Sequence, residues 1–127
     1  MRPRLSEFRK ELVSLLDEKG IPLSVKDIHS VNKDVDLSTV YRALEYLEST
    51  GAIKSIIIPC NCGQFRYYHT DKKHVHYLHC EKCHTFYSVP YCGLNKIEKD
   101  IHKNFNFEVT NHILFFFGKC QNCVQSE

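Results

Sequence analysis

Two Cys-x-x-Cys pairs carry the most specific chemistry in this chain. The first pair is Cys80 and Cys83, the second is Cys120 and Cys123, and 36 residues lie between them. Two intervening residues let both sulfurs of a pair reach one Zn²⁺ at about 2.3 Å, and two pairs fill all four tetrahedral positions. A site filled in this way is structural, because no position stays open for a substrate. In a short chain with no secretory segment, the spacing favours zinc over two redox pairs or buried thiols.

The composition sets the class of protein that must hold these residues. The chain has 127 residues, 43% hydrophobic and 25% charged, which is typical of one ordinary globular domain or two small ones. It begins with a charged amphipathic segment, and no apolar run approaches the length that spans a membrane. We therefore expect a cytoplasmic protein with reduced thiols and no membrane partner. The net charge of +2 is too small to indicate nucleic-acid binding by itself.

The first half of the chain predicts three helices and a hairpin. Apolar residues at helical spacing mark a helix over about 5–19. A capping-box pattern at Ser24 opens a short second helix, and Gly51 ends a third. Two β-rich runs, 53–58 and 64–69, then flank a turn-rich connector. This order is typical of a winged helix-turn-helix, whose third helix enters the major groove of DNA.

The third helix carries the candidate contacts to a double-stranded DNA operator. They are Ser38, Thr39, Tyr41 and Arg42. The Tyr41 ring can contact a thymine methyl group, and Arg42 can reach a phosphate. Taken singly, each side chain is better explained as part of a solvated helix face, so the hypothesis rests on the helix as a whole. The first half is electrically neutral, which implies modest affinity per subunit and favours a homodimer on a palindromic operator.

The second half predicts a small α/β unit closed by the zinc. Strands over 75–79 and 85–89 flank the first cysteine pair, and a helix covers about 94–104. A long strand over 107–118 leads to the second pair. The run 113–117 is apolar on both faces, so we expect it to form part of a subunit interface.

Together these elements predict an α+β protein of two domains. A winged helix-turn-helix domain covers 1–70, and an α/β dimerisation domain with a structural four-cysteine zinc site covers 71–127.

With these elements in place, the sequence resembles the ferric uptake regulator family of metal-sensing repressors. Four segments in the family's order carry the resemblance: residues 37–44, the His-rich segment into Cys80-x-x-Cys83, Thr110-Asn111-His112, and Cys120-x-x-Cys123. The resemblance implies a metal-dependent repressor of metal uptake or homeostasis genes. It also implies a basic residue that reaches the minor groove, for which Arg4 is the candidate.

The resemblance further implies a regulatory metal site that controls DNA binding. His74 and His76 alternate along one strand and so share a face. His112 matches the family's histidine in the long strand. These three are the expected regulatory ligands, although three surface histidines would be the simpler explanation in most chains. Such a site should take donors from both halves of the chain, so that the metal locks one orientation.

The fourth regulatory ligand departs from the family's pattern. The place of the usual carboxylate falls on Asn95, a poor ligand, with Cys92 about one turn before it and Glu98 one turn after. We expect Cys92 to be the ligand; the alternative is an ordinary buried thiol. Imidazole and thiolate donors without a carboxylate favour Zn²⁺ over Fe²⁺ or Mn²⁺, although they also accept nickel or copper. This favours the zinc uptake regulator branch.

A second metal site of many family members is missing here in its usual form. Its positions read Pro22, Tyr68, Val75 and Tyr77. Peroxide sensing by bound iron is thereby disfavoured. Unusual donors stand instead on or near the hairpin, at Cys60, Cys62 and His69. The two cysteines could bind a soft metal, form a redox pair, or simply fit the tip of the hairpin.

Three functions compete on these grounds. The favoured one is a dimeric metal-dependent repressor, with an iron- or manganese-responsive regulator as the alternative within the family. The second is a thiol redox sensor that uses Cys60, Cys62 and Cys92. A zinc enzyme is disfavoured, because catalytic zinc needs an open position and a general base, and the hydrolase and deaminase signatures are missing. We therefore expect no enzymatic activity and no small-molecule substrate.

Overall fold

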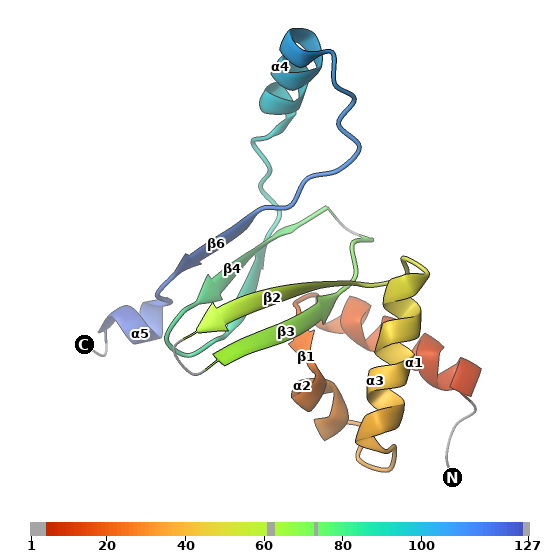
Figure 1. The fold of residues 1–127 in the computed structure, drawn as a ribbon. Coiled ribbons are helices and arrows are strands. Elements are labelled where there is room, and N and C mark those ends of the chain that lie inside the picture. Colours follow the sequence, from red (N-terminus) through yellow and green to blue (C-terminus); the bar gives the residue numbers. More distant parts are fainter. Residues whose placement is uncertain (1–4, 61–62, 73, 126–127) are drawn as a thin grey trace. The chain divides into compact units, whose positions relative to one another are not determined.

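A computed structural model describes residues 5–60, 63–72 and 74–125 (Figure 1). The chain divides into two compact units, Met1–Lys73 and His74–Glu127. Across the described ranges, no helix combines the length and the apolar character needed to cross a membrane.

The first unit has the winged helix-turn-helix order that the sequence predicts. Its elements are α1 (Leu5–Lys19), β1 (Leu23–Ser24), α2 (Val25–Ser30), α3 (Leu37–Ser49), β2 (Lys54–Cys60) and β3 (Gly63–His69). Strands β2 and β3 pair as an antiparallel hairpin, and β1 pairs antiparallel with the other edge of β3. Strand β1 could not be predicted from the sequence, because two residues are too few to show an alternating pattern.

Apolar spacing along α1 and α3 builds the core of the first unit. Phe8, Leu12 and Leu16 of α1 recur every fourth residue and are all nearly fully buried. Residues of α3, Val40 and Leu44 among them, belong to the same buried cluster. Because these residues of α3 pack into the core, the opposite face of α3 points away from it.

The second unit is a three-stranded sheet with two helices. Its elements are β4 (His76–Cys80), β5 (Phe86–Val89), α4 (Asn95–Phe105), β6 (Phe115–Gly118) and α5 (Gln121–Gln125). The strand order is β5-β4-β6, with β4 antiparallel to β5 and parallel to β6. The parallel pair requires a crossover, and α4 lies within it (Figure 1). The short helix α5 was not predicted.

The prediction of one long strand over 107–118 was wrong, since only Phe115–Gly118 is a strand. Its partner β4 has five residues, and the pairing starts at Tyr77 opposite Phe115, so no ladder extends further back. Before the strand, the His112 backbone N–H donates to Asn111 Oδ1 at 2.9 Å. Asparagine side chains compete for backbone groups in this way and favour irregular structure over a ladder.

Candidate metal centres

The sheet of the second unit brings all four paired cysteines together. Strand β4 ends at Cys80, which lies opposite Gly118 at the end of β6. Cys120 follows two residues later, and the single turn of α5 carries Cys123. A backbone hydrogen bond from Glu81 N to Gly118 O, 2.8 Å long, joins the turn after β4 to the end of β6.

The four sulfurs have the spacing of a tetrahedral thiolate site. All four lie within 4.8 Å of one another, and none of the four cysteines is in a disulfide. Cys83 Sγ and Cys120 Sγ are 3.7 Å apart. Four Zn–S bonds of about 2.3 Å at tetrahedral angles place neighbouring sulfurs roughly 3.8 Å apart. The residues therefore fit a Zn²⁺ ion.

Local interactions shift the pKa values of two of these thiols in opposite directions. The backbone N–H groups of Cys83 and Cys120 both donate to Cys80 Sγ at 3.4 Å. They lower the pKa of the Cys80 thiol to about 5. The neighbouring sulfur of Cys120, followed by burial, raises the pKa of Cys123 to about 12. Four thiolates cannot coexist here without a cation, and a divalent ion supplies the compensating charge.

A second cluster joins the three predicted histidines to Cys92. The ligand atoms of His74, His76, Cys92 and His112 all lie within 4.8 Å of one another. His112 Nε2 is 3.3 Å from His76 Nε2 and 3.4 Å from Cys92 Sγ. Tetrahedral coordination at about 2.0–2.1 Å for nitrogen and 2.3 Å for sulfur requires separations of roughly 3.3–3.6 Å. This cluster fits a four-coordinate ion of the zinc type.

The donors of this cluster come from three segments of the second unit: the start of β4, the chain between β5 and α4, and the chain before β6. His76 lies in β4, His74 lies two residues before it, and Cys92 lies in the segment between β5 and α4. His112 comes from the irregular segment before β6. Burial and the rings of His74 and His112 lower the pKa of His76, which keeps its imidazole neutral and able to bind metal. All four donors belong to the second unit, and the expectation that the first unit also contributes a donor stays a prediction.

Comparison with known proteins identifies the family of this chain. The profile of the ferric uptake regulator family matches residues 2–117. The chain belongs to the ferric uptake regulator family. The ferric uptake regulation protein of Helicobacter pylori (strain ATCC 700392 / 26695) is 27% identical over 126 residues, which cover 96% of this chain and 83% of that protein. The peroxide operon regulator of Bacillus subtilis (strain 168) is 28% identical over 94 residues, covering 74% and 63%.

Solved structures of ferric uptake regulators have the same fold. The Helicobacter pylori regulator, described as having three functional metal binding sites, gives a TM-score of 0.70 at 25% identity, over 93% of this chain and 82% of that chain. The Francisella tularensis regulator with iron gives 0.71 at 25% identity, over 98% and 94%. The α+β fold predicted from the sequence is confirmed, and the function of this family member is metal-dependent transcriptional regulation.

The predicted DNA-reading residues lie on the outer face of α3. Ser38, Tyr41 and Arg42 are exposed and Thr39 is half-buried. Arg4 lies outside the described residues. Farther along the helix, the Arg9 guanidinium of α1 lies over the Tyr46 ring, 3.6 Å from its centroid, and Tyr46 remains 46% exposed.

The hairpin donors do not form one site in the described part of the chain. Strand register places Cys60 opposite Gly63 and His69 opposite Lys54, at opposite ends of the hairpin. Six residues of strand, about 20 Å, separate these ends. His69 therefore cannot share an ion with Cys60. Cys62 and the Cys60 side chain lie outside the described residues, so their role stays a prediction.

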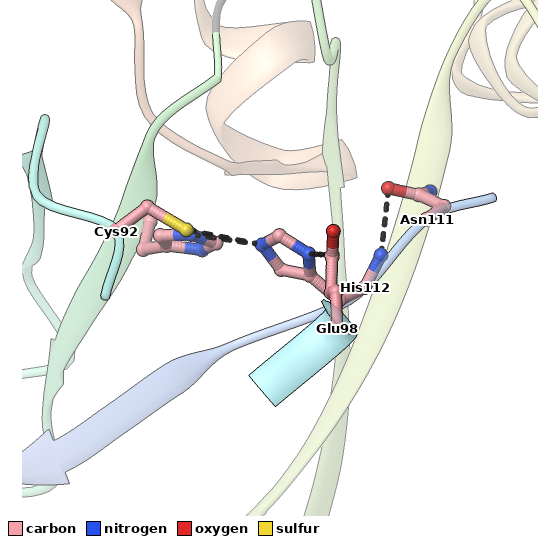
Figure 2. Close-up of polar contacts among 5 residues, drawn as sticks. Cys92, Glu98, Asn111 and His112 are labelled. Carbon is pink, nitrogen blue, oxygen red and sulfur yellow. Dashed lines mark hydrogen bonds and ion pairs between the residues drawn. The ribbon is translucent and has the colours of Figure 1, made fainter. Parts of the chain in front are cut away.

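One contact beside the second cluster was not predicted from the sequence. Glu98, whose position suggested only a possible metal ligand, accepts a hydrogen bond from His112 Nδ1 at 2.5 Å (Figure 2). The signal was its position one helical turn from the place of the family's carboxylate. That position could not show which side of the His112 ring the carboxylate would reach.

Proposed function

We propose that this family member is a zinc-responsive repressor that binds a palindromic operator as a homodimer in the cytoplasm. The observation that carries the choice of metal is the second cluster. Three imidazoles and one thiol converge, and no carboxylate oxygen belongs to the donor set found among the described residues. Such donors favour zinc over Mn²⁺, which prefers oxygen ligands, and over Fe²⁺, whose non-haem sites typically include a carboxylate.

The two clusters have different roles in this proposal. The four cysteines hold a permanent structural Zn²⁺, because thiolates fill every position. His74, His76, Cys92 and His112 hold an exchangeable Zn²⁺, and its occupancy reports the zinc supply. The regulated genes are those for zinc uptake or homeostasis. Neither cluster leaves an open position beside a general base, so we expect no enzymatic activity.

The redox alternative is less well supported. A thiol sensor needs a second thiol close to the first, because reversible oxidation ends in a disulfide. Among the described residues, the cluster around Cys92 contains imidazoles and no other thiol. Cys92 therefore fits a metal ligand better than half of a disulfide.

Ligation of His74 offers a route from the ion to the DNA-reading unit. His74 is the first residue of the second unit. On the other side of Lys73, the chain is attached to α1, since Thr70 Oγ1 donates to an Asp17 carboxylate oxygen and Lys72 Nζ is 2.9 Å from Asp17 Oδ2. Only one residue separates Lys72, which is attached to α1, from the proposed ligand His74. When His74 is held as a ligand, the freedom of the chain between the units falls, and fewer relative orientations remain for binding DNA.

Asp17→Ala should therefore reduce the effect of zinc on operator binding without reducing the affinity for zinc. It removes the carboxylate that holds Thr70 and Lys72, so the chain leaving the first unit is freer. We expect zinc affinity to stay unchanged and the zinc-induced gain in operator affinity to fall about fivefold. Zinc competition titration and fluorescence anisotropy measure the two quantities. Glu18→Ala, an exposed carboxylate on the same helix, is the control, and an equal response in both variants would remove Asp17 from the route.

Exposed apolar side chains support the homodimer. Helix α4 buries none of its residues within one chain, and Ile97 and Phe105 are 52% and 77% exposed. Ile113 of the run before β6 is also 77% exposed, and Phe116 and Phe117 of β6 are 51% exposed. So many large apolar side chains exposed in one small unit support a subunit interface. A second copy of the same unit would cover it.

Tyr41 provides a test of how the operator is read. Its exposed ring on α3 can contact a thymine methyl group, so Tyr41→Ala should weaken operator binding by about 1–2 kcal/mol and random DNA much less. The comparison uses zinc-loaded protein and anisotropy at one salt concentration. Tyr91→Ala, at a 79% exposed tyrosine of the second unit, serves as the control. Equal losses on operator and random DNA would assign Tyr41 to packing or to phosphate contact.

The proposed function is tested by metal titration against operator binding. A duplex selected from a random pool by the zinc-loaded protein serves as the operator. Protein with only its structural zinc is then titrated with Zn²⁺, Fe²⁺ or Mn²⁺ under anaerobic conditions. Zinc should raise operator affinity at the lowest free concentration. A response to Fe²⁺ or Mn²⁺ at lower free concentration than to Zn²⁺ would contradict the zinc assignment.

A further inference from the structure

We propose that Glu98 is a positioning residue for the regulatory site, which holds His112 in the orientation and tautomer that metal binding requires and ties α4 to the site. This inference rests on the proposed metal site. It assigns no metal bond to Glu98, although Glu98 lies near the place where the family carries a ligand carboxylate. Its role comes instead from the side of the His112 ring that it contacts.

The two nitrogens of His112 face different partners. Nε2 points into the cluster, 3.3 Å from His76 Nε2 and 3.4 Å from Cys92 Sγ. Nδ1 is 2.5 Å from Glu98 Oε1. Figure 2 shows Cys92 and Glu98 on opposite sides of the ring. Glu98 is accordingly outside the group of four ligand atoms that lie within 4.8 Å of one another.

This arrangement decides which nitrogen can bind a metal. A carboxylate accepts hydrogen bonds and cannot donate them, so Nδ1 must carry the proton and Nε2 must present its lone pair. Without Glu98 the neutral ring would divide between its two tautomers and turn more freely. The negative charge also strengthens Nε2 as a metal ligand. Carboxylates that hold metal-bound histidines in this way typically contribute about 10- to 100-fold in metal affinity.

The same contact attaches α4 to the site. Glu98 lies in the first turn of α4, and its carboxylate is partly buried with 30% of its side chain exposed. The helix buries none of its residues, so apolar packing within the chain contributes little to its position. A charge-assisted hydrogen bond is therefore a substantial part of what holds the start of α4. Fixing His112 at an ion then also steadies the helix with the exposed apolar face.

Two Glu98 variants and one control separate these effects. Glu98→Gln keeps an oxygen that can accept from Nδ1 but removes the charge, and Glu98→Ala removes both. Asp100→Asn is the control, because it removes one exposed carboxylate from the same helix. The first measurement is long-range ¹H–¹⁵N NMR of the histidine rings in protein that carries only its structural zinc. The second is competition for Zn²⁺ against a chromophoric chelator.

We expect a graded result. Wild type and Asp100→Asn should show His112 protonated at Nδ1, and Glu98→Ala should show a mixture of tautomers. Glu98→Gln should lie between them, because its amide can either accept from Nδ1 or donate to it. Zinc affinity should fall about 10- to 100-fold in Glu98→Ala and less in Glu98→Gln, and it should not change in Asp100→Asn. Hydrogen exchange of the backbone amide at position 98, which donates to Leu94 O, should quicken in Glu98→Ala alone.

Three results would overturn the inference. One is unchanged zinc affinity and an unchanged His112 tautomer in Glu98→Ala. The second is equal loss of affinity in Asp100→Asn, which would reduce the effect to general charge. The third is loss of one ligand from bound Co²⁺ in Glu98→Ala by X-ray absorption, which would make Glu98 a ligand. Failure of the proposed function is distinguishable, because then the wild-type protein itself would bind no ion beyond its structural zinc.

Discussion

Cys80→Ser should unfold the second unit and remove the structural zinc. Cys80 is buried at the end of β4, where its sulfur accepts two backbone hydrogen bonds and meets the other three thiols. A structural Zn²⁺ contributes roughly 10–16 kcal/mol to folding in zinc-finger peptides. A whole domain is stable by only about 5–15 kcal/mol, and a unit as small as 74–127 stands at the low end. The folding free energy lost with the zinc site therefore exceeds the stability that side-chain packing can supply in this unit.

Metal analysis and hydrogen exchange measure this result. Purified Cys80→Ser should carry less than one equivalent of tightly held zinc, and amides of β4, β5 and β6 should lose protection while those of α1 and α3 keep it. Cys92→Ser is the matched control, because it removes a thiol from the other cluster of the same unit and should keep the structural zinc. A folded second unit in zinc-free Cys80→Ser would show that the four cysteines are not a structural metal site.

His112→Ala should abolish metal-dependent operator binding and leave the fold intact. The substitution removes one of the four donors. His112 Nε2 lies 3.4 Å from Cys92 Sγ and 3.3 Å from His76 Nε2, so its loss leaves these two without their neighbour in the cluster. The effect on zinc affinity should exceed the roughly 100-fold that loss of a supporting hydrogen bond can cause. Operator affinity should then match that of wild type without the exchangeable zinc, at every zinc concentration that leaves the protein soluble.

His102→Ala is the control for His112→Ala. His102 is an exposed histidine on α4, outside both clusters of the described residues. It should bind zinc and the operator as wild type does. Gel filtration with light scattering should show that both variants keep the dimer. Wild-type zinc response in His112→Ala would remove His112 from the regulatory site.

The parts of the fold with local signals could be predicted from the sequence. The Ser24 capping box is present, with Asp27 N donating to Ser24 Oγ at 3.1 Å, because its partners are three residues apart. The cysteine spacing likewise indicates a closed cluster whatever the intervening fold. The long strand over 107–118 failed as a prediction because strand length depends on the partner. Nothing in its own apolar residues shows that β4 has only five residues to pair with.

The regulatory cluster was partly predictable for the same reason. Alternation along one strand predicted that His74 and His76 share a face, but β4 begins only at His76 and His74 lies before it. The family pattern indicated His112. The choice of Cys92 over Glu98 could only be a preference, since both lie about one turn from Asn95. The structure places both beside His112, one on each nitrogen. Which nitrogen each contacts depends on how the chain enters and leaves α4, and no local pattern encodes that.

One titration tests the central claim most directly. Protein that carries its structural zinc is titrated with Co²⁺ while absorption reports the bound ion and anisotropy reports operator binding in the same sample. We predict that one further equivalent binds per chain with a thiolate-to-cobalt band that Cys92→Ser removes, and that operator affinity rises in step with that band. Full operator affinity before any further ion binds, or a band that saturates without change in operator affinity, would contradict the account.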